Sequence, residues 1–361
     1  MTMGSWQHTV LGMMSGTSLD GLDLAMCRIG WDGARWEASI LAAETVAYTD
    51  TWKKALSGSM KLDGVHLALL SVRLGHYMGT CAADFIVRTG IRPDFLSSHG
   101  HTVFHRPEEG MTLQIGSGAH MAAVSGFPVV CDFRTLDVAL GGQGAPLVPV
   151  GDKLLFGHYD FCLNLGGIAN ISYELGTERQ AFDICPVNMA LDLIARHFGR
   201  EYDEGGAMAA SGTPDPRLLD QLDQLSFYSM SPPKTLGREW FDLHFLPLLQ
   251  ASALSGPDLM ATVSEHIAGQ IGRVLDGWNG SVLVTGGGAW NTHLIQRIQA
   301  LSSAQVIIPD AQIVNFKEAL VFALLGVLRW NLLANTMDSV TGASHAASSG
   351  VVWMPAAASK A

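Results

Sequence analysis

The chain has few cysteines and no long hydrophobic run. Its five cysteines form no C-x-x-C pair and have mostly apolar neighbours: Cys27, Cys81, Cys131, Cys162 and Cys185. This pattern predicts buried free thiols in a reducing compartment rather than a disulfide framework. The longest apolar run, Ala319 to Leu328, is about half the length that crosses a bilayer. The N-terminus meets Asp20 before a signal-peptide core develops, so we expect a soluble, cytoplasmic protein.

Positive charge is also scarce. The sequence has 22 Lys and Arg against 33 Asp and Glu, a formal net charge of -11, and the basic residues form no cluster. Such a field repels nucleic acid and anionic membrane surfaces, so neither is expected as a partner. An anionic substrate would have to be held by local loops and a divalent cation.

The chain is long and apolar enough for about two domains, with 361 residues of which 48% are hydrophobic. A three-strand meander is predicted near the N-terminus, at 9–14, 22–29 and 36–46, and a second one at 161–165, 171–174 and 181–184. The spacing from Asp63 to Thr89 predicts a helix that Asp63 caps. Because each meander precedes alternating helices and strands, we expect an α/β protein that arose by duplication.

Three glycine-rich turns stand between these predicted elements. The first, Ser15 to Asp23, and the second, Leu165 to Asn170, each join two apolar strands, and the third, Gly286 to Gly288, lies between a strand and a helix. Glycine lets backbone N–H groups approach an anion closely. Either hairpin alone is most simply a turn, but two in one chain suggest that two lobes grip one polyphosphate. A fourth glycine-rich segment, 141–146, is interpreted as an interdomain hinge or a substrate loop.

Asp183 is the candidate general base. It ends a predicted strand shortly after the second hairpin, where open α/β proteins place catalytic carboxylates; the alternative is a helix cap. Three histidines, His99, His101 and His105, raise the question of a metal site. They share one face only if their strand is unbroken. Gly100 interrupts the run, and no acidic or thiol ligands lie beside it, so we expect the histidines to line a substrate pocket rather than to bind a metal.

Together these residues resemble the anhydro-N-acetylmuramic acid kinases, within the sugar kinase, Hsp70 and actin superfamily. The resemblance covers nearly the whole chain and rests on these segments: Gly12 to Asp23, Ser98-His99-Gly100 with Thr102, Asp132-Phe133-Arg134 with Asp137, Gly141 to Pro149, Leu165 to Asn170, Tyr202-Asp203 with Gly206-Ala207, Ala209 to Gly212, Gly286 to Asn291, and Phe316 to Ala319.

The resemblance implies two RNase H-like domains of the actin, hexokinase and Hsp70 type, with ATP in the cleft between them. Residues 1–135 would form the first domain and 136–349 the second, with 350–361 packing back onto the first. The implied reaction consumes ATP, opens the 1,6-anhydro ring of an amino sugar and phosphorylates O6, a step of peptidoglycan recycling. A cytoplasmic homodimer is implied as well.

The resemblance also implies a role for individual residues. Asp183 would be the catalytic base, and Asp20 would hold Mg²⁺ through water. ATP would be bound by Gly16, Thr17, Ser18, Leu19, Asp20, Gly21, Leu22, Asp23, Gly166, Gly167, Asn170, Gly286, Gly287 and Gly288. The sugar would be contacted by Ser98, His99, Thr102, Arg134 and Glu318.

The chain departs from the family pattern near the expected sugar. The family usually writes Asp-Thr-Gly-Pro-Gly-Asn where residues 183–188 read Asp-Ile-Cys-Pro-Val-Asn, and it commonly has Gln at His101 and Asp at Ser117. If position 187 takes a positive φ, the β-branched Val187 strains or reshapes the turn. Two alternatives therefore stand beside the main hypothesis: a kinase of another anhydro sugar or sugar such as levoglucosan, and an ATP-binding homologue without catalysis.

Overall fold

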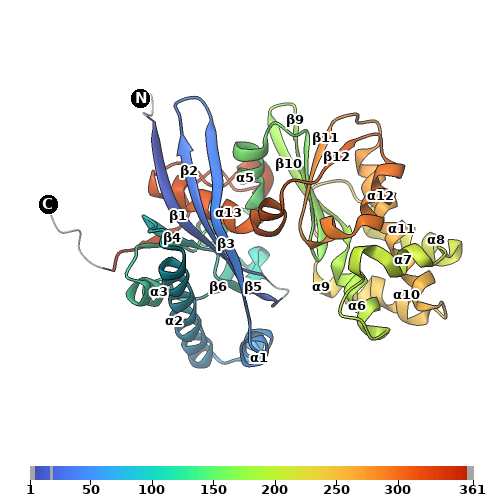
Figure 1. The fold of residues 1–361 in the computed structure, drawn as a ribbon, viewed down its shortest axis with the longest axis horizontal. Coiled ribbons are helices and arrows are strands. Elements are labelled where there is room, and N and C mark those ends of the chain that lie inside the picture. Colours follow the sequence, from blue (N-terminus) through green and yellow to red (C-terminus); the bar gives the residue numbers. More distant parts are fainter. Residues whose placement is uncertain (1–4, 17–18, 356–361) are drawn as a thin grey trace. The chain divides into compact units, whose positions relative to one another are not determined.

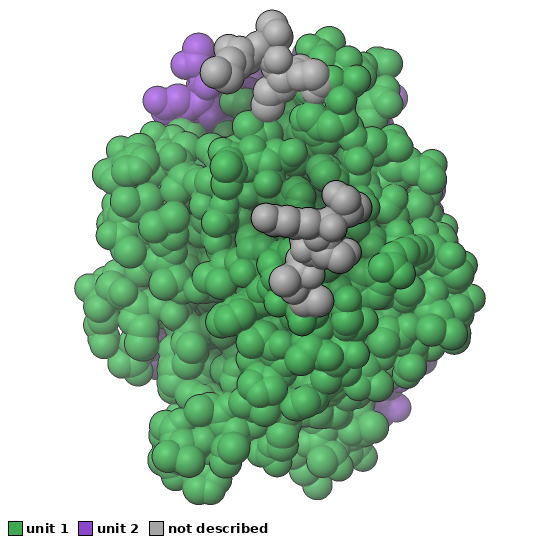
Figure 2. Space-filling view, turned by 90° about the vertical axis from the view of Figure 1, so that its left-hand side faces the viewer, with its two compact units in different colours: residues 1–156, 316–361 green, residues 157–315 purple. Residues whose placement is uncertain are grey.

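The computed structural model describes residues 5–16 and 19–355. The chain divides into two compact units, which Figure 2 colours separately. Unit 1 contains residues 1–156 and 316–361, and unit 2 contains residues 157–315. This division differs from the expected boundary at residue 135. Two hydrogen bonds join the segments after residue 135 to residues before it: the Ser97 hydroxyl donates to the Phe322 carbonyl over 2.5 Å, and Arg134 Nη1 donates to the Gly144 carbonyl over 2.6 Å.

The sheet of unit 1 has the described strand order β13-β7-β4-β1-β2-β3 (Figure 1). Its strands are β1 (Trp6–Ser15), β2 (Gly21–Trp31), β3 (Trp36–Ala47), β4 (Phe95–Ser98), β7 (Val129–Cys131) and β13 (Val351–Trp353). The first three pair antiparallel, whereas β4 and β7 continue the sheet in parallel with β1. Strand β13 pairs antiparallel with β7, so residues 351–353 form the edge of this sheet. Residues 356–361 lie outside the described residues.

Two long helices contribute to unit 1, one of them only from residue 316 onward. Helix α2 (Gly64–Thr89) begins after Asp63, whose carboxylate caps it, and ends at Gly90 with a φ of 67°. Helix α13 (Ala311–Trp330) lies so close to β1 that a Cβ on Gly12 would collide with the Ala319 carbonyl. By length and composition α13 could cross a membrane, but 67% of its apolar window is buried inside the structure, as in a core helix. Further elements of unit 1 are α1 (Asp50–Ser57), β5 (His101–Arg106), β6 (Met111–Ile115), α3 (Gly118–Ser125), α4 (Thr135–Ala139), α5 (Val148–Phe156) and α14 (Asp338–Thr341).

The sheet of unit 2 repeats this topology in the order β10-β9-β8-β11-β12. Its strands are β8 (Phe161–Leu165), β9 (Ile168–Leu175), β10 (Glu178–Pro186), β11 (Ser281–Thr285) and β12 (Gln305–Ile307). Strands β8, β9 and β10 form an antiparallel meander, and β11 and β12 follow β8 in parallel. Each unit therefore has the strand order and directions of the RNase H-like fold, and the predicted fold class is confirmed.

The core of unit 2 lies between its sheet and a set of helices. Helix α11 (Gly256–Leu275) is the most buried of these, with Val263, Ile267 and Ile271 fully enclosed. The other described helices of unit 2 are α6 (Asn188–His197), α7 (Ala207–Ser211), α8 (Pro216–Asp223), α9 (Arg238–Trp240), α10 (Leu246–Ala251) and α12 (Thr292–Leu301). All five cysteines of the chain are free, and Cys27, Cys162 and Cys185 are buried.

Candidate active site

The first glycine turn joins β1 to β2 in unit 1. The pairing of the two strands ends at Ser15 and Leu22, which flank the turn. Tyr48 N–H donates to the Asp20 carbonyl over 3.2 Å. Leu19 has a φ of 60°, an unusual value for a residue with a Cβ. A Cβ on Gly21 would lie 2.5 Å from the Val46 carbonyl oxygen, so β3 itself requires glycine there. Leu22 is buried, and Gly16 is partly exposed. Thr17 and Ser18 lie outside the described residues.

Acidic side chains gather beside this turn. Asp20 is exposed, while Asp23 is partly buried and accepts a 2.6 Å hydrogen bond from Thr45 Oγ1. Burial raises the pKa of Asp23, and the charge of Asp20 raises it further. Burial likewise raises the pKa of Glu318 on α13, to which the charge of Asp23 adds. This mutual repulsion makes the turn of unit 1 a favourable place for a cation.

A hydrated Mg²⁺ fits this donor set. Among the described residues, no three His, Cys, Asp or Glu side chains are arranged to hold a metal ion directly. Mg²⁺ needs no such cage, because it commonly keeps several waters and takes one or two carboxylates together with substrate phosphates. Asp20 and Asp23 meet that smaller requirement.

Arg134, which is partly buried, and His99, which is buried, form a polar pair in unit 1. His99 Nδ1 lies 3.0 Å from the Gly100 carbonyl, and Arg134 Nε and Nη2 lie 3.1 and 2.9 Å from His99 Nε2. Burial lowers the pKa of His99, and the charge of Arg134 lowers it further, so the ring is neutral at pH 7. Nδ1–H then donates to Gly100, and Nε2 accepts from Arg134. Arg134 Nη1 also donates to the Gly144 carbonyl over 2.6 Å, which anchors the 141–146 loop within unit 1.

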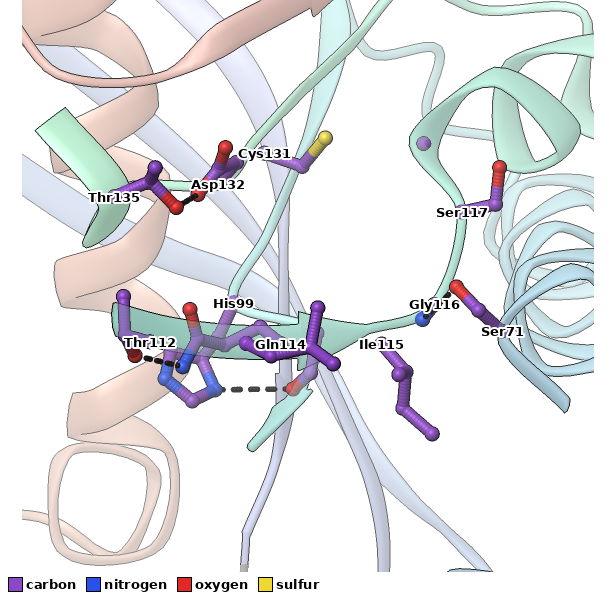
Figure 3. A pocket seen from close by; sticks show the side chains of 13 residues that line it. Ser71, His99, Thr112, Gln114, Ile115, Gly116, Ser117, Cys131, Asp132 and Thr135 are labelled. Atoms are coloured by element: carbon purple, nitrogen blue, oxygen red, sulfur yellow. Dashed lines mark hydrogen bonds between the residues drawn. The ribbon is translucent and has the colours of Figure 1, made fainter. Parts of the chain in front are cut away.

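His99 also lines a polar pocket of about 150 Å³ in unit 1 (Figure 3). The pocket is shared by His99 and Gly100, by the β6 residues Thr112 and Gln114, and by Ser117 and Asp132. Gln114 Nε2 donates to Thr102 and Thr112, whereas its buried Oε1 has no partner among the described residues. Ser98 is buried and its hydroxyl accepts from Gly100 N–H. The predicted residues His99, Ser98 and Thr102 thus lie in or beside one pocket. Gln114 lines the same pocket, but the sequence analysis did not identify it.

The three histidines do not share one strand face. His99 precedes β5, and Gly100 between the strands has a φ of 75°. His101 Nδ1 contacts Ser15 Oγ at 3.1 Å, and His105 Nδ1 contacts Thr112 Oγ1 at 3.1 Å. Each ring therefore has a different partner, and the arrangement matches the pocket interpretation better than the metal interpretation.

The second and third glycine turns lie against each other in unit 2. The carbonyls of Gly166 and Gly167 accept hydrogen bonds from the backbone N–H groups of residues 187–189, at the start of α6. A Cβ on Gly286 would lie 2.6 Å from Asn164 Oδ1, and one on Gly288 would lie 2.7 Å from Leu165 Cβ. Gly287 is exposed beside the Asn188 amide. Strand register places Asn170 opposite Asp183, so the predicted residues of unit 2 gather at one end of its sheet.

Asp183 lies near the end of the edge strand β10 and is partly buried. Its Oδ2 accepts a 2.8 Å hydrogen bond from Leu236 N–H, and its own N–H donates to the Lys234 carbonyl over 3.0 Å. Burial raises the pKa of Asp183 to about 6, against the lowering effect of the Leu236 bond. It caps no helix, since the N-cap of α6 is Val187. Sequence reasoning missed the 234–236 segment, because no local motif connects it to a residue some fifty positions earlier.

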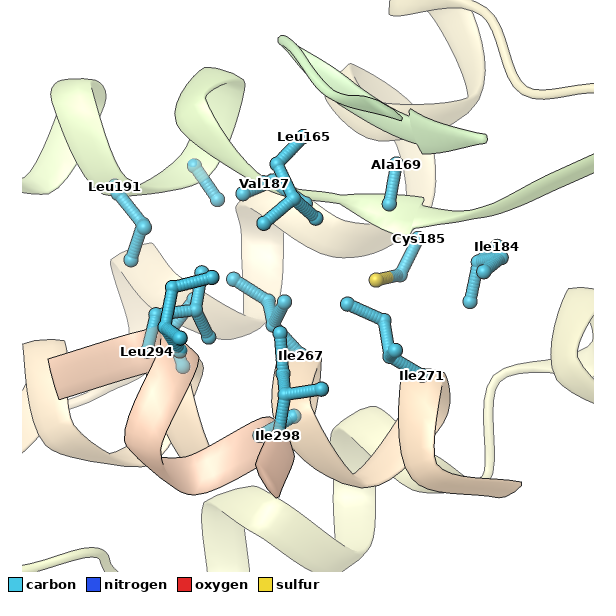
Figure 4. Packing of buried hydrophobic residues seen from close by; sticks show 14 of the residues in the cluster. Leu165, Ala169, Ile184, Cys185, Val187, Leu191, Ile267, Ile271, Leu294 and Ile298 are labelled. Atoms are coloured by element: carbon cyan, nitrogen blue, oxygen red, sulfur yellow. The ribbon is translucent and has the colours of Figure 1, made fainter. Parts of the chain in front are cut away.

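Val187 does not take the positive φ that would strain a β-branched residue. Its φ is -120°, so the β-branched side chain needs no left-handed backbone. The side chain is fully buried and belongs to the same core cluster as Leu191, Ile267 and Leu294 (Figure 4). The altered turn is therefore accommodated by packing, with a bulge in β10 between Asp183 and Cys185.

Comparison with known proteins gives one consistent family. The family model for anhydro-N-acetylmuramic acid kinase matches residues 8–355. A protein of that name from Pseudomonas putida is 37% identical over 353 residues, covering 92% of this chain and 96% of the relative. Another from Acaryochloris marina is 35% identical over 366 residues, covering 93% and 97%, and one from Synechococcus elongatus is 34% identical, covering 95% and 99%. The chain belongs to the anhydro-N-acetylmuramic acid kinase family.

Proposed function

We propose that this protein uses ATP and water to open the 1,6-anhydro ring of anhydro-N-acetylmuramic acid and to phosphorylate O6. The product would be N-acetylmuramic acid 6-phosphate, as in peptidoglycan recycling. The observation that carries the proposal is Asp183: a single carboxylate whose pKa is raised to about 6 by burial, next to a glycine turn suited to phosphate. A general base works best when its pKa is near the operating pH.

The proposed reaction needs one base and no separate acid. Asp183 takes a proton from water as the water oxygen bonds to the anomeric carbon, and the bond from that carbon to O6 breaks. In glycoside hydrolysis the departing oxygen normally receives a proton from an acid. Here O6 would receive the γ-phosphoryl group, and the bond from that phosphorus to the β-phosphate oxygen breaks to release ADP.

ATP binding is assigned to the glycine turns of both units. Gly166, Gly167 and Gly286 to Gly288 would approach ATP in unit 2, and the 16–23 turn would do so in unit 1. Phosphoryl transfer depends mainly on alignment and charge neutralisation. Asp20 would hold Mg²⁺ through water; when bound, the ion neutralises charge on the phosphates.

Sugar binding is assigned to the pocket side of unit 1. The rigid guanidinium of Arg134, partly buried against the neutral His99, suits a carboxylate such as a lactyl group. Glu318, Ser98 and Thr102 complete the proposed set.

A second candidate substrate is another anhydro sugar such as levoglucosan. It is favoured by Ser117, which lines the pocket where relatives commonly carry an acid. Its hydroxyl pairs with His120 at 2.8 Å.

The test is a substrate panel with ATP and product analysis. We expect anhydro-N-acetylmuramic acid to exceed levoglucosan in kcat/KM by at least about a hundredfold, since a partly buried charged group rejects an analogue without its partner. An equal or reversed preference between the two sugars would overturn the substrate assignment. If the protein binds ATP but forms no ADP with any sugar of the panel, it is a homologue that has lost catalysis. A cytoplasmic location and a homodimer complete the proposal and are checked by fractionation and by light scattering.

A further inference from the structure

The segment that contacts Asp183 lies outside the regular elements of unit 2. It runs from Met230 to Gly237 and is mostly exposed, apart from the buried Leu236. Two hydrogen bonds dock it on the edge strand β10, from Leu236 N–H to Asp183 Oδ2 and from Asp183 N–H to the Lys234 carbonyl. An exposed segment without its own helix or strand needs an anchor elsewhere to hold such a contact.

The first anchor is the contact of Lys234 with Phe227, which precedes the segment in the chain. Lys234 Nζ donates to the Phe227 carbonyl over 3.2 Å and lies 4.7 Å from the centre of the Phe227 ring. Phe227 is buried, so this contact ties the segment to a fixed point.

The second anchor is a hydrogen-bonded chain of three side chains, of which the middle one is buried. Tyr228 Oη lies 3.0 Å from His266 Nε2, and His266 Nδ1 lies 2.6 Å from Asp223 Oδ1. His266 is fully buried on α11, beside the core residue Ile267. The deeply buried helix α11 thereby holds the residue adjacent to Phe227.

The protonation states of this chain fix its donors. Burial lowers the pKa of His266 despite the opposing effect of Asp223, so the ring is neutral at pH 7. Burial acts to raise the pKa of Asp223, but hydrogen bonds from His266 and Arg273 bring it to about 2. Nδ1–H therefore donates to the Asp223 carboxylate, and Nε2 accepts from the Tyr228 hydroxyl. Gln270 Nε2 also donates to Asp223 over 2.9 Å.

We propose that Tyr228, His266 and Asp223 are positioning residues, which hold the 230–237 segment so that Leu236 N–H stays on the carboxylate of Asp183. The inference rests on the proposed function, in which Asp183 is the base. Without this hydrogen bond, the buried carboxylate would lose its main stabilising donor and would ionise less readily. Among the described residues, the side-chain hydrogen bonds of these three run to one another, to Gln270 and to Arg273.

The test compares two variants in the full-length protein. Tyr228→Phe removes only the hydroxyl that His266 holds. Thr262→Val is the matched control, since Thr262 is buried one turn earlier on α11 and its hydroxyl accepts from Asp215 N–H, away from the segment. Tyr228→Phe removes one hydrogen bond, whereas Thr262→Val removes two, because the Thr262 hydroxyl also donates to the Asp258 carbonyl over 2.6 Å. The control should therefore lose at least as much stability.

We expect Tyr228→Phe to lower kcat about five- to twentyfold with little change in KM for ATP. The acidic limb of its kcat profile should move to higher pH, because the lost Leu236 bond no longer lowers the pKa of Asp183. Hydrogen exchange at residues 230–237 should rise. Thr262→Val should leave the acidic limb of the kcat profile and the hydrogen exchange at residues 230–237 as in the wild type.

Two results would overturn the inference in distinguishable ways. An unchanged acidic limb and unchanged exchange in Tyr228→Phe, while Asp183→Asn abolishes turnover, would remove the positioning role and leave the proposed function standing. Retained turnover in Asp183→Asn would remove the proposed function, and the positioning role with it.

Discussion

Single residues of this protein take their chemical character from burial rather than from sequence neighbours. Asp183 and His99 are both shifted toward their neutral forms, the first with a raised pKa and the second with a lowered one. In each case desolvation is the largest cause. A sequence pattern places such residues near a site, but burial gives them their protonation states.

The raised pKa of Asp183 predicts a stability effect with a definite sign. The folded state binds the proton more tightly than the unfolded chain, so the ionised carboxylate destabilises the fold above about pH 6. This penalty fades as pH falls toward 4. Asp183→Asn should therefore stabilise the protein by roughly 1–3 kcal/mol at pH 8 and by little at pH 4, measured by urea unfolding.

A carboxylate with the opposite shift supplies the control. Hydrogen bonds from Ser281 lower the pKa of Asp160, so Asp160→Asn should lower stability at pH 8. A destabilised Asp183→Asn at pH 8 would show that the Asp183 carboxylate is not held in an unfavourable environment.

Substitution of Arg134 should affect KM for the sugar and KM for ATP differently, because Arg134 is assigned to the sugar. Its guanidinium contacts His99 and Gly144 together, a geometry that an ammonium does not reproduce. Arg134→Lys should raise KM for the sugar about ten- to a hundredfold and change KM for ATP less than about twofold, measured by steady-state kinetics. Arg106→Lys, an exposed arginine of unit 1 paired with Glu109, should change neither. A rise confined to KM for ATP would contradict the assignment of Arg134 to the sugar.

At the scale of elements, the glycine turns differ in what their glycines do. Gly286 has a φ of 83° and no room for a Cβ, so the fold requires it. Gly167 is exposed, and a Cβ there would meet nothing within 4 Å. A glycine that the fold does not need is the more informative candidate for ligand contact.

This difference predicts opposite outcomes for two alanine substitutions. Gly286→Ala should destabilise unit 2 by about 2 kcal/mol or more. Gly167→Ala should leave thermal stability unchanged while raising KM for ATP at least about tenfold, since the new methyl group would stand where phosphate approaches. Unchanged ATP kinetics in Gly167→Ala would contradict the placement of phosphate at the second turn.

The sequence predicted elements well and long-range contacts poorly. The limits of β8 and α2 and the cap at Asp63 follow from local periodicity and end signals. The contact of Leu236 with Asp183 and the role of Gln114 in the pocket depend on tertiary packing. Val187 shows the same limit, since the family's usual glycine at this position indicates neither its negative φ nor its burial in the core of unit 2.

At the scale of the whole molecule, two units of the same topology carry different chemistry. Unit 2 carries Asp183 and two adjoining glycine turns, whereas unit 1 carries the acidic turn, the Arg134–His99 pair and the polar pocket. The proposed reaction needs both sets, since water activation is assigned to unit 2 and sugar binding to unit 1.

Turnover of anhydro-N-acetylmuramic acid with ATP in ¹⁸O-labelled water tests the central claim most directly. We predict one ¹⁸O at the anomeric carbon of each 6-phosphate formed, one ADP per sugar, and loss of at least about a thousandfold in rate in Asp183→Asn. Label found in inorganic phosphate instead, or wild-type labelling by Asp183→Asn, would contradict the claim that Asp183 activates the attacking water.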